Sequence, residues 1–168
     1  MKLQLRGIKT GRVFSLLLFS FFHMAAAFTI GAQVIYSEQS IYTPSEKKRL
    51  TSSKSPDDRI RVYDTAFERI RKEIEKDIRE DRFDDASLTL SAWSALLKES
   101  RADIEANVNT KKKSGRLKQY EIHLRQAINE LRALRAHAPV ELYDAFISLA
   151  DQAEETRRKF MDILFNLQ

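Results

Sequence analysis

Residues 57–82 of the chain read DDRIRVYDTAFERIRKEIEKDIREDR. The large apolar side chains in this stretch recur every three or four residues and share one narrow arc at about 100° per residue. They are Ile60, Tyr63, Phe67, Ile70, Ile74 and Ile78. Asp57 or Asp58 is suited to cap the N-terminus of a helix. The pattern predicts an amphipathic α-helix over 57–82.

Three further segments, 85–108, 116–137 and 139–166, carry the same helical period. The first boundary lies near residues 81–85, where the apolar phase breaks and Asp84 is suited to cap a new helix. The second is the polar run from Asn107 to Gly115. The third is Pro139, which suits the first turn of a helix because its missing N–H has no partner there. Trp93 lies on the apolar arc of 85–108 and is expected in the core.

Four amphipathic helices joined by short loops imply that consecutive helices are antiparallel neighbours. No segment alternates with period two for long, which disfavours a fold with strands. The sequence therefore predicts an all-α fold. Its finer form is an antiparallel up-down-up-down four-helix bundle over 57–168, preceded by a signal peptide and a flexible linker.

The N-terminal 32 residues have the layout of a secretory signal peptide. Residues 1–12 are cationic, residues 13–22 are mostly apolar, and Ala25 and Ala27 fit the small-residue rule for cleavage before Phe28. A second option is cleavage before Gln33. The alternative is an uncleaved anchor, because residues 13–35 carry no formal charge and are long enough to span a bilayer. Either interpretation places the later residues outside the cytoplasm, in the periplasm or beyond it, or held at the cytoplasmic membrane.

Residues 33–56 are rich in serine and contain Pro44 and Pro56. No apolar period is sustained over them, so they are interpreted as a disordered linker between the export segment and the bundle domain.

The chain has 29 Lys and Arg residues against 24 Asp and Glu residues, a net charge of +5. Residues 1–32 hold four of these cations and no acid, so the rest of the chain is close to neutral. Export and the absence of a nucleic-acid-binding motif argue against a nucleic-acid partner. The remaining positive charge is expected at one pole of the bundle, where the predicted membrane-surface site comprises Lys47, Lys48, Arg49, Lys111, Lys112 and Lys113.

Most catalytic and metal-binding patterns are missing from the sequence. There is no cysteine, no Glu-x-x-His pattern and no glycine-rich phosphate loop, and the histidines after the signal, His123 and His137, are far apart. The carboxylates of residues 73–85 alternate with lysine and arginine, as is typical of a solvated helix face rather than an acid–base site. We therefore expect no catalytic residues, no cofactor and no metal.

Arg157 interrupts the apolar stripe of 139–166. A buried cation needs a partner, and in the expected bundle the residue opposite is near Asp64. The hypothesis is an ion pair between Arg157 and Asp64 or Glu68; the alternative is that Arg157 extends along the surface to water.

The first interpretation of function is an exported, non-enzymatic helical-bundle protein of the bacterial envelope that acts by protein–protein interaction or as a structural factor. The second is a membrane-surface protein, anchored by its N-terminal segment and docked through the basic pole. A small carboxylate-based envelope hydrolase and an extracytoplasmic chaperone remain further alternatives. The expected partners are an envelope protein, an anionic membrane surface or a second copy of the chain.

Overall fold

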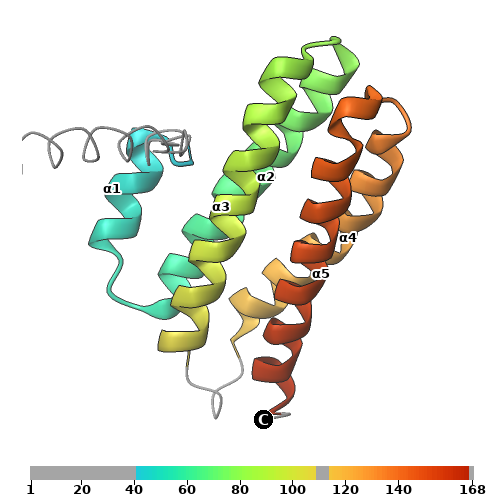
Figure 1. Cartoon of the computed structure of the whole chain (residues 1–168). Helices are drawn as coiled ribbons and strands as arrows, with labels where there is room; N and C mark the ends of the chain where they lie inside the picture. The colour runs from blue at the N-terminus through green and yellow to red at the C-terminus, as the bar shows by residue number, and fades with distance from the viewer. Residues whose placement is uncertain (1–40, 109–113, 167–168) are drawn as a thin grey trace, which may run out of the picture. The chain divides into compact units, whose positions relative to one another are not determined.

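A computed structural model describes residues 41–108 and 114–166, and helices joined by short turns account for these residues. The elements are α1 (Pro44–Ser52), α2 (Pro56–Arg79), α3 (Phe83–Asn107), α4 (Gly115–Arg135), the short 3-10 helix η2 (Val140–Leu142) and α5 (Tyr143–Phe165) (Figure 1). The all-α prediction is confirmed. The expected signal peptide, residues 33–40 of the expected linker and the last two residues lie outside the described residues.

The prediction of a disordered linker over 33–56 is wrong for Pro44–Ser52, because these residues form helix α1. A capping box begins it: the Thr43 side chain accepts a hydrogen bond from the Glu46 N–H, and the Thr43 N–H donates to the Glu46 carboxylate at 2.7 Å. Pro44 occupies the first turn. The helix has nine residues, too few to show an apolar period, and so short a helix is marginal in water unless it packs on other elements.

The turn between α2 and α3 places Asp81 in the left-handed region, with φ at 56°. The Arg82 N–H donates to the Asp77 carbonyl at 2.8 Å, and the Asp81 N–H donates to the Ile78 carbonyl at 3.3 Å. This is the Schellman pattern that satisfies the last carbonyls of a helix. Helix α3 begins after Arg82, so the expected N-cap Asp84 lies in the first turn instead.

Ser114, at the end of the loop between α3 and α4, is fixed by polar contacts. Ser114 is the N-cap of α4; its side chain accepts a hydrogen bond from the Leu117 N–H and donates to Asp57 Oδ1 at 2.6 Å.

Pro139 precedes η2, and α5 begins at Tyr143 rather than at 139, because the 3-10 helix takes up the expected first turn.

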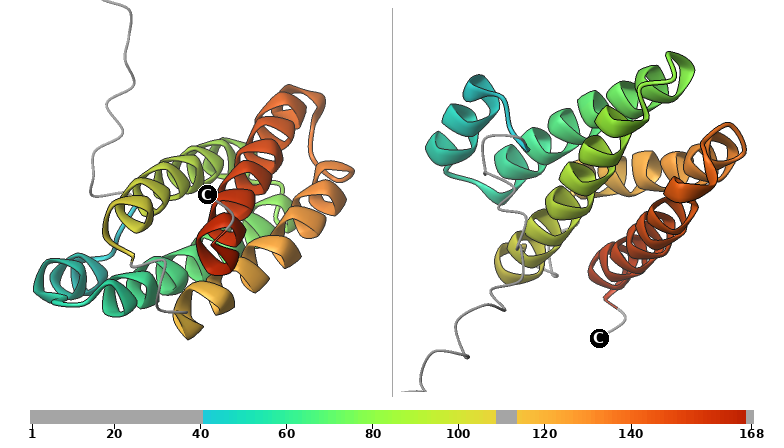
Figure 2. Two further views of the ribbon diagram at one scale, coloured as in Figure 1. Left: turned by 90° about the horizontal axis from the view of Figure 1, so that it is seen from below. Right: turned by 45° about the horizontal axis from the view of Figure 1, so that its top comes forward.

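Hydrogen bonds and ring contacts between helices give their relative directions. Helices α2 and α3 are antiparallel, since Arg59 pairs with Asp103 and Asp77 with Thr89. Helices α4 and α5 are also antiparallel, since Arg157 pairs with Glu121 and Arg135 lies over the Tyr143 ring. Each pair therefore forms a helical hairpin (Figures 1 and 2).

The two hairpins are joined through helices that run in the same direction. Helix α4 lies beside α2, where Asp64 contacts His123 and Arg71 contacts Glu130. Helix α5 lies beside α3, where Ser94 bonds to Gln152 and Arg101 to Glu155.

The main helix contacts therefore run from α2 to α3, from α3 to α5, from α5 to α4 and from α4 back to α2. The short loops had implied that all consecutive helices are neighbours. This expectation is wrong for α3 and α4. Helices α3 and α4 lie across a diagonal, and so do α2 and α5.

An aromatic cluster occupies the centre of the core. The ring centroids of Phe67 and Trp93 are 5.0 Å apart, those of Phe67 and Tyr120 are 5.6 Å apart, and those of Tyr120 and Phe160 are 5.4 Å apart. These four side chains come from α2, α3, α4 and α5, so every long helix contributes to one cluster. The prediction that Trp93 lies in the core is confirmed, with 1% of its surface exposed.

Within residues 41–108 and 114–166, no helix combines the length and the apolar character needed to cross a membrane.

Candidate interaction surface at the α1–α2 edge

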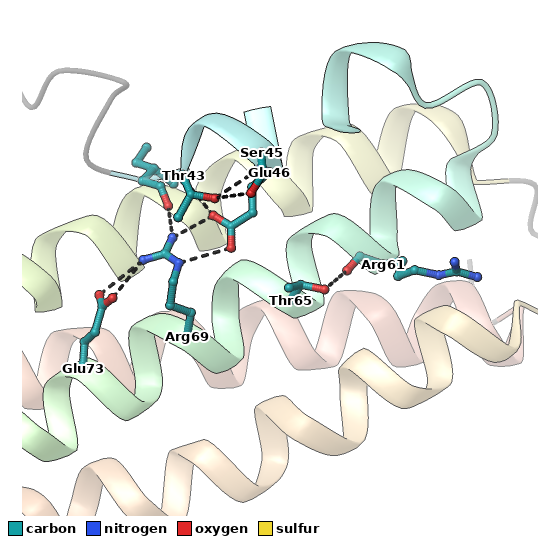
Figure 3. Close-up of polar contacts among 8 residues, drawn as sticks. Thr43, Ser45, Glu46, Arg61, Thr65, Arg69 and Glu73 are labelled. Carbon is teal, nitrogen blue, oxygen red and sulfur yellow. Dashed lines mark hydrogen bonds and ion pairs between the residues drawn. The ribbon is translucent and has the colours of Figure 1, made fainter. Parts of the chain in front are cut away.

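Helix α1 is attached to α2 by a bidentate ion pair between Glu46 and Arg69 (Figure 3). The Arg69 Nε donates to Glu46 Oε1 at 3.1 Å, and Nη2 donates to Glu46 Oε2 at 3.0 Å. The same Nη2 donates to the Ile41 carbonyl at 2.7 Å, so one guanidinium holds both the start of α1 and the residues before it. Glu46 is buried, with 5% of its surface exposed.

The ionisation of Glu46 reflects this arrangement. Burial alone would raise the pKa of the Glu46 carboxyl, but the hydrogen bonds from Arg69 and from the Thr43 N–H hold the pKa below its ordinary value. Burial likewise opposes ionisation of Arg69, and the Glu46 and Glu73 carboxylates raise its pKa. The pair therefore remains charged through the neutral range.

Docking through Glu46 directs the next three residues of α1, Lys47, Lys48 and Arg49, to an exposed surface. They belong to the predicted membrane-surface site. The other members of that site, Lys111, Lys112 and Lys113, lie outside the described residues. We use the name α1–α2 edge for the exposed cations Lys47, Lys48, Arg49, Lys54 and Arg61.

A hollow of about 370 Å³ lies in this edge, between the last turn of α1 and the first turns of α2. Arg49, Lys54 and Arg61 line it together with Ser52 and Ser53, and Asp58 and Val62 complete the lining. The Arg61 side chain extends away from the Glu46–Arg69 pair (Figure 3). We call this hollow the basic notch.

A smaller cavity of about 250 Å³ lies beneath α1, lined by Ile41, Tyr42, Lys47, Leu50, Thr51, Arg59 and Glu99. The Tyr42 hydroxyl is buried there, close to the Glu99 carboxylate. Burial and the nearby Glu99 carboxylate raise the pKa of Tyr42. The residues before α1 thus contribute both apolar packing and one buried hydroxyl to the core.

A hydrogen-bonded cluster around Asp103 connects α2 and α3 at their interface. Arg59 donates to both carboxylate oxygens of Asp103, at 2.7 and 2.8 Å, and the Tyr63 hydroxyl donates to Oδ2 at 2.9 Å. Asn107 donates to Oδ1 at 3.0 Å. Burial, with the hydrogen bond to Asp103, raises the pKa of Tyr63, which keeps the hydroxyl protonated and able to donate.

The interface between α2 and α4 contains a histidine–carboxylate cluster that resembles an acid–base site. His123 Nδ1 lies 2.7 Å from Asp64 Oδ1 and 3.8 Å from Glu68 Oε1, and His123 Nε2 lies 2.7 Å from the Gln119 amide. Burial raises the pKa of Asp64, although the bond to His123 opposes the shift. Because both ring nitrogens contact neighbouring side chains, His123 presents no free nitrogen to a substrate, and the cluster ties two helices together.

The predicted ion pair between Arg157 and Asp64 is not formed. Arg157 Nη1 lies 3.0 Å from Glu121 Oε1 on α4, and Nη2 lies 3.2 Å from Glu154 Oε1 on α5. Asp64 is paired with His123 instead. The physical reason is the order of the helices: α5 packs against α3 and α4, so α2 is not its neighbour.

Three carboxylates of the acidic stretch 73–85 form ion pairs with basic residues nearby. Glu73 pairs with Arg69, Glu75 with Arg79 and Glu80 with Arg82. Asp77 also forms an ion pair with Arg82, but it is buried, and it accepts a hydrogen bond from the Thr89 hydroxyl. In the part of the chain that the structure describes, no three His, Asp or Glu side chains are grouped so that they could hold a metal ion.

Sequence reasoning did not identify the Glu46–Arg69 pair. The signal that could have found it is local: Thr43 and Glu46 have the spacing of a capping box, with a proline between them. The partner Arg69 carries no such signal, because it is one of several exposed-looking arginines on α2.

No family model, no curated protein and no solved structure matches the chain. The assignment of a function therefore rests on the side chains and contacts described above.

Proposed function

We propose that this chain is an exported, non-enzymatic protein of a bacterial envelope, built as an up-down-up-down four-helix bundle that acts by protein–protein interaction or as a structural factor. Residues 1–32 direct export, as a cleaved signal peptide or as an anchor, and the helical region works outside the cytoplasm. Binding takes place on the exposed faces of the helices rather than in an enclosed catalytic cleft.

One observation carries this proposal: the ionisable side chains between helices pair with one another. Asp103 pairs with Arg59, Glu46 with Arg69, and Glu121 with Arg157. Catalytic carboxylates need an environment that separates their pKa values and leaves one of them free to react. Groups that are bonded across a seam instead hold neighbouring helices together, which leaves the exposed faces for recognition.

Export is tested with a fused alkaline phosphatase, an enzyme that is active only after leaving the cytoplasm. The fusion to residues 1–56 is compared with a matched fusion to residues 33–56. We expect activity from the first fusion alone, and the mass of the mature chain then distinguishes cleavage before Phe28 or Gln33 from an intact anchor. Equal activity of the two fusions would refute export by residues 1–32.

Interaction is tested by site-specific photo-crosslinking in intact cells. The probe replaces Leu88 on α3 or Ile147 on α5, which are apolar and exposed, and Glu75 on α2 serves as the exposed, charged control. A discrete product formed with one envelope protein, or with a second copy, from some positions and not others supports the proposal. The same diffuse products from all three positions contradict it.

A second candidate function is docking on an anionic membrane, and the α1–α2 edge favours it. Lys48, Arg49, Lys54 and Arg61 are exposed, and none of them forms an ion pair with a residue in 41–108 or 114–166. A cation near an anionic membrane surface contributes roughly 1 kcal/mol to binding. Four uncompensated cations on one edge would be enough for weak, salt-sensitive docking.

Vesicle co-sedimentation tests this second candidate. We expect the purified chain to sediment with anionic vesicles at low salt and to be released at high salt, because exposed charges are screened. Neutral vesicles are the control for insertion of the N-terminal apolar segment. Failure to bind anionic vesicles better than neutral ones at low salt would exclude docking.

A further inference from the structure

The basic notch is unusual because its cations form no ion pair with any residue that the structure describes. Helix α2 carries five arginines, and Arg59, Arg69, Arg71 and Arg79 each form an ion pair with a described carboxylate. Arg61 is the only arginine of α2 that forms no ion pair with a residue in 41–108 or 114–166. Arg49 and Lys54 line the same hollow and also form no ion pair with a described residue.

The acid in the lining of the basic notch already has a hydrogen-bond partner. Asp58 lies in the lining of the basic notch, one helical turn before Arg61. Its carboxylate accepts a hydrogen bond from the Ser55 hydroxyl at 2.7 Å, and its N–H donates to the same hydroxyl at 3.1 Å. Asp58 therefore serves the N-cap of α2, and near the positive end of that helix its charge is stabilised without Arg61.

The cations come from three positions around the hollow rather than from one helix face. Arg49 is on α1, Lys54 is in the connection between the helices, and Arg61 is on α2. The hydroxyls of Ser52 and Ser53 line the hollow too; both donate to the Arg49 carbonyl, at 3.2 and 2.7 Å, and a hydroxyl can rotate toward a ligand. A group with several charged oxygens can contact all of these donors at once, whereas a carboxylate has only two oxygens.

We propose that the basic notch between α1 and α2 is a binding site for a phosphate group, held by Arg49, Lys54 and Arg61. Guanidinium groups bind phosphate oxygens in pairs, and lysine supplies a further point charge. The phosphate is either that of a lipid headgroup or that of a free phosphorylated molecule. In its lipid form the inference rests on the docking candidate above; in its free form it stands without membrane docking.

Phosphate binding is measured first, by nuclear magnetic resonance, with inorganic phosphate as the probe. The experiment uses the purified chain at low salt, and the mass of the chain shows whether and where the N-terminal segment has been cleaved. We expect saturable shifts at the side-chain N–H signals of Arg49 and Arg61 and at the amides of Ser52 and Ser53. Shifts spread evenly over the surface, or no shift, would overturn the proposal.

Matched variants then separate the notch from general basicity. Arg61→Gln should weaken phosphate binding roughly tenfold, because it removes charge-assisted hydrogen bonds. Arg125→Gln is the control, since Arg125 is exposed on α4 and forms no ion pair with a described residue. Equal effects of the two substitutions would overturn the proposal. Arg61 is exposed, so both variants are expected to keep the wild-type spectrum outside the substituted site.

Vesicles of equal total charge distinguish the two sources of the phosphate. Phosphatidic acid presents a terminal phosphate, whereas phosphatidylglycerol carries its phosphate between two esters. A preference for phosphatidic acid that Arg61→Gln removes assigns the notch to a lipid headgroup. Phosphate binding without that preference assigns it to a free phosphorylated molecule. If Arg61→Gln leaves vesicle binding unchanged and phosphate causes no shifts, the phosphate site at the basic notch is refuted. Membrane docking remains supported in that case.

Discussion

Helix α1 and the four long helices are held in place by different forces. The long helices share the aromatic cluster of Phe67, Trp93, Tyr120 and Phe160, in which all four side chains are almost fully buried. Helix α1 contributes only Leu50 to the margin of the core, with Ile41 and Tyr42 just before it. Its polar attachment is the Glu46–Arg69 pair.

We therefore expect that α1 can be released while the rest of the fold survives. Apolar burial is non-directional and resists changes of pH and salt, whereas an ion pair depends on ionisation and on exact partners. Local opening is expected where apolar contacts are few. The α1–α2 edge, including the basic notch, would be lost with α1, so this attachment controls the proposed binding surface.

The largest effect is expected from Phe67→Ala. The ring is completely buried and contacts both Trp93 and Tyr120, so its removal leaves a cavity among three helices. The free energy of unfolding should fall by about 3–5 kcal/mol. Chemical denaturation followed by Trp93 fluorescence measures the loss. A loss below about 1 kcal/mol would show that the cluster does not dominate the core.

The next effect is expected from Glu46→Gln, which keeps the size of the side chain and removes its charge. Arg69 would lose its buried partner, and we expect α1 to be destabilised by about 1–2 kcal/mol. Hydrogen exchange should accelerate at the amides of α1 and remain unchanged in α4. The matched control is Glu73→Gln, because Glu73 pairs with the same arginine but is exposed. Uniform acceleration in α1 and α4 would contradict separate attachment.

Lowering the pH should have the same effect on α1 as Glu46→Gln, because protonation removes the same charge. The folded pKa of Glu46 is lowered from its ordinary value of 4.5, so its contribution is complete above that pH and is lost as the pH falls through the lowered value. Exchange or fluorescence of a probe on α1 should therefore change at a higher pH than the unfolding of the core. In Glu46→Gln this early transition should be absent. Its persistence there would assign it to another group.

A small gain is expected from Asp81→Gly. Asp81 has a positive φ in the turn between α2 and α3, a conformation that glycine adopts without strain. The stability of the long helices should rise by about 0.5 kcal/mol, with no change in the attachment of α1. Thermal unfolding measures the gain, and Asp84→Gly serves as the control because it places glycine inside a helix, where it destabilises. Equal effects of both substitutions would be inconsistent with the turn geometry.

The smallest effect is expected at Arg157. A double-mutant cycle with Glu121 should give a coupling energy of a few tenths of a kcal/mol, as is usual for partly exposed pairs. The same cycle with Asp64 should give none, because α5 and α2 are not neighbours. Coupling to Asp64 that exceeds coupling to Glu121 would contradict the order of the helices.

Residues 57–82 show how far a sequence pattern reaches. The arc of Ile60, Tyr63, Phe67, Ile70, Ile74 and Ile78 predicted a helix and its buried face, and all six side chains are buried. The pattern is local, since it follows from the geometry of a single helix. At the α1–α2 edge, Lys47, Lys48 and Arg49 were found by their charge, but their helix and its partner Arg69 were not, because nine residues are too few for a period.

The four long helical segments, their apolar faces and the concentration of positive charge in residues 1–32 follow from the sequence alone. The tertiary structure decided the order in which the helices meet, the partners of Arg157 and Asp64, and the docking of α1. The physical reason is that helix formation depends on neighbours in the chain, whereas the partner of a side chain depends on which helices pack together.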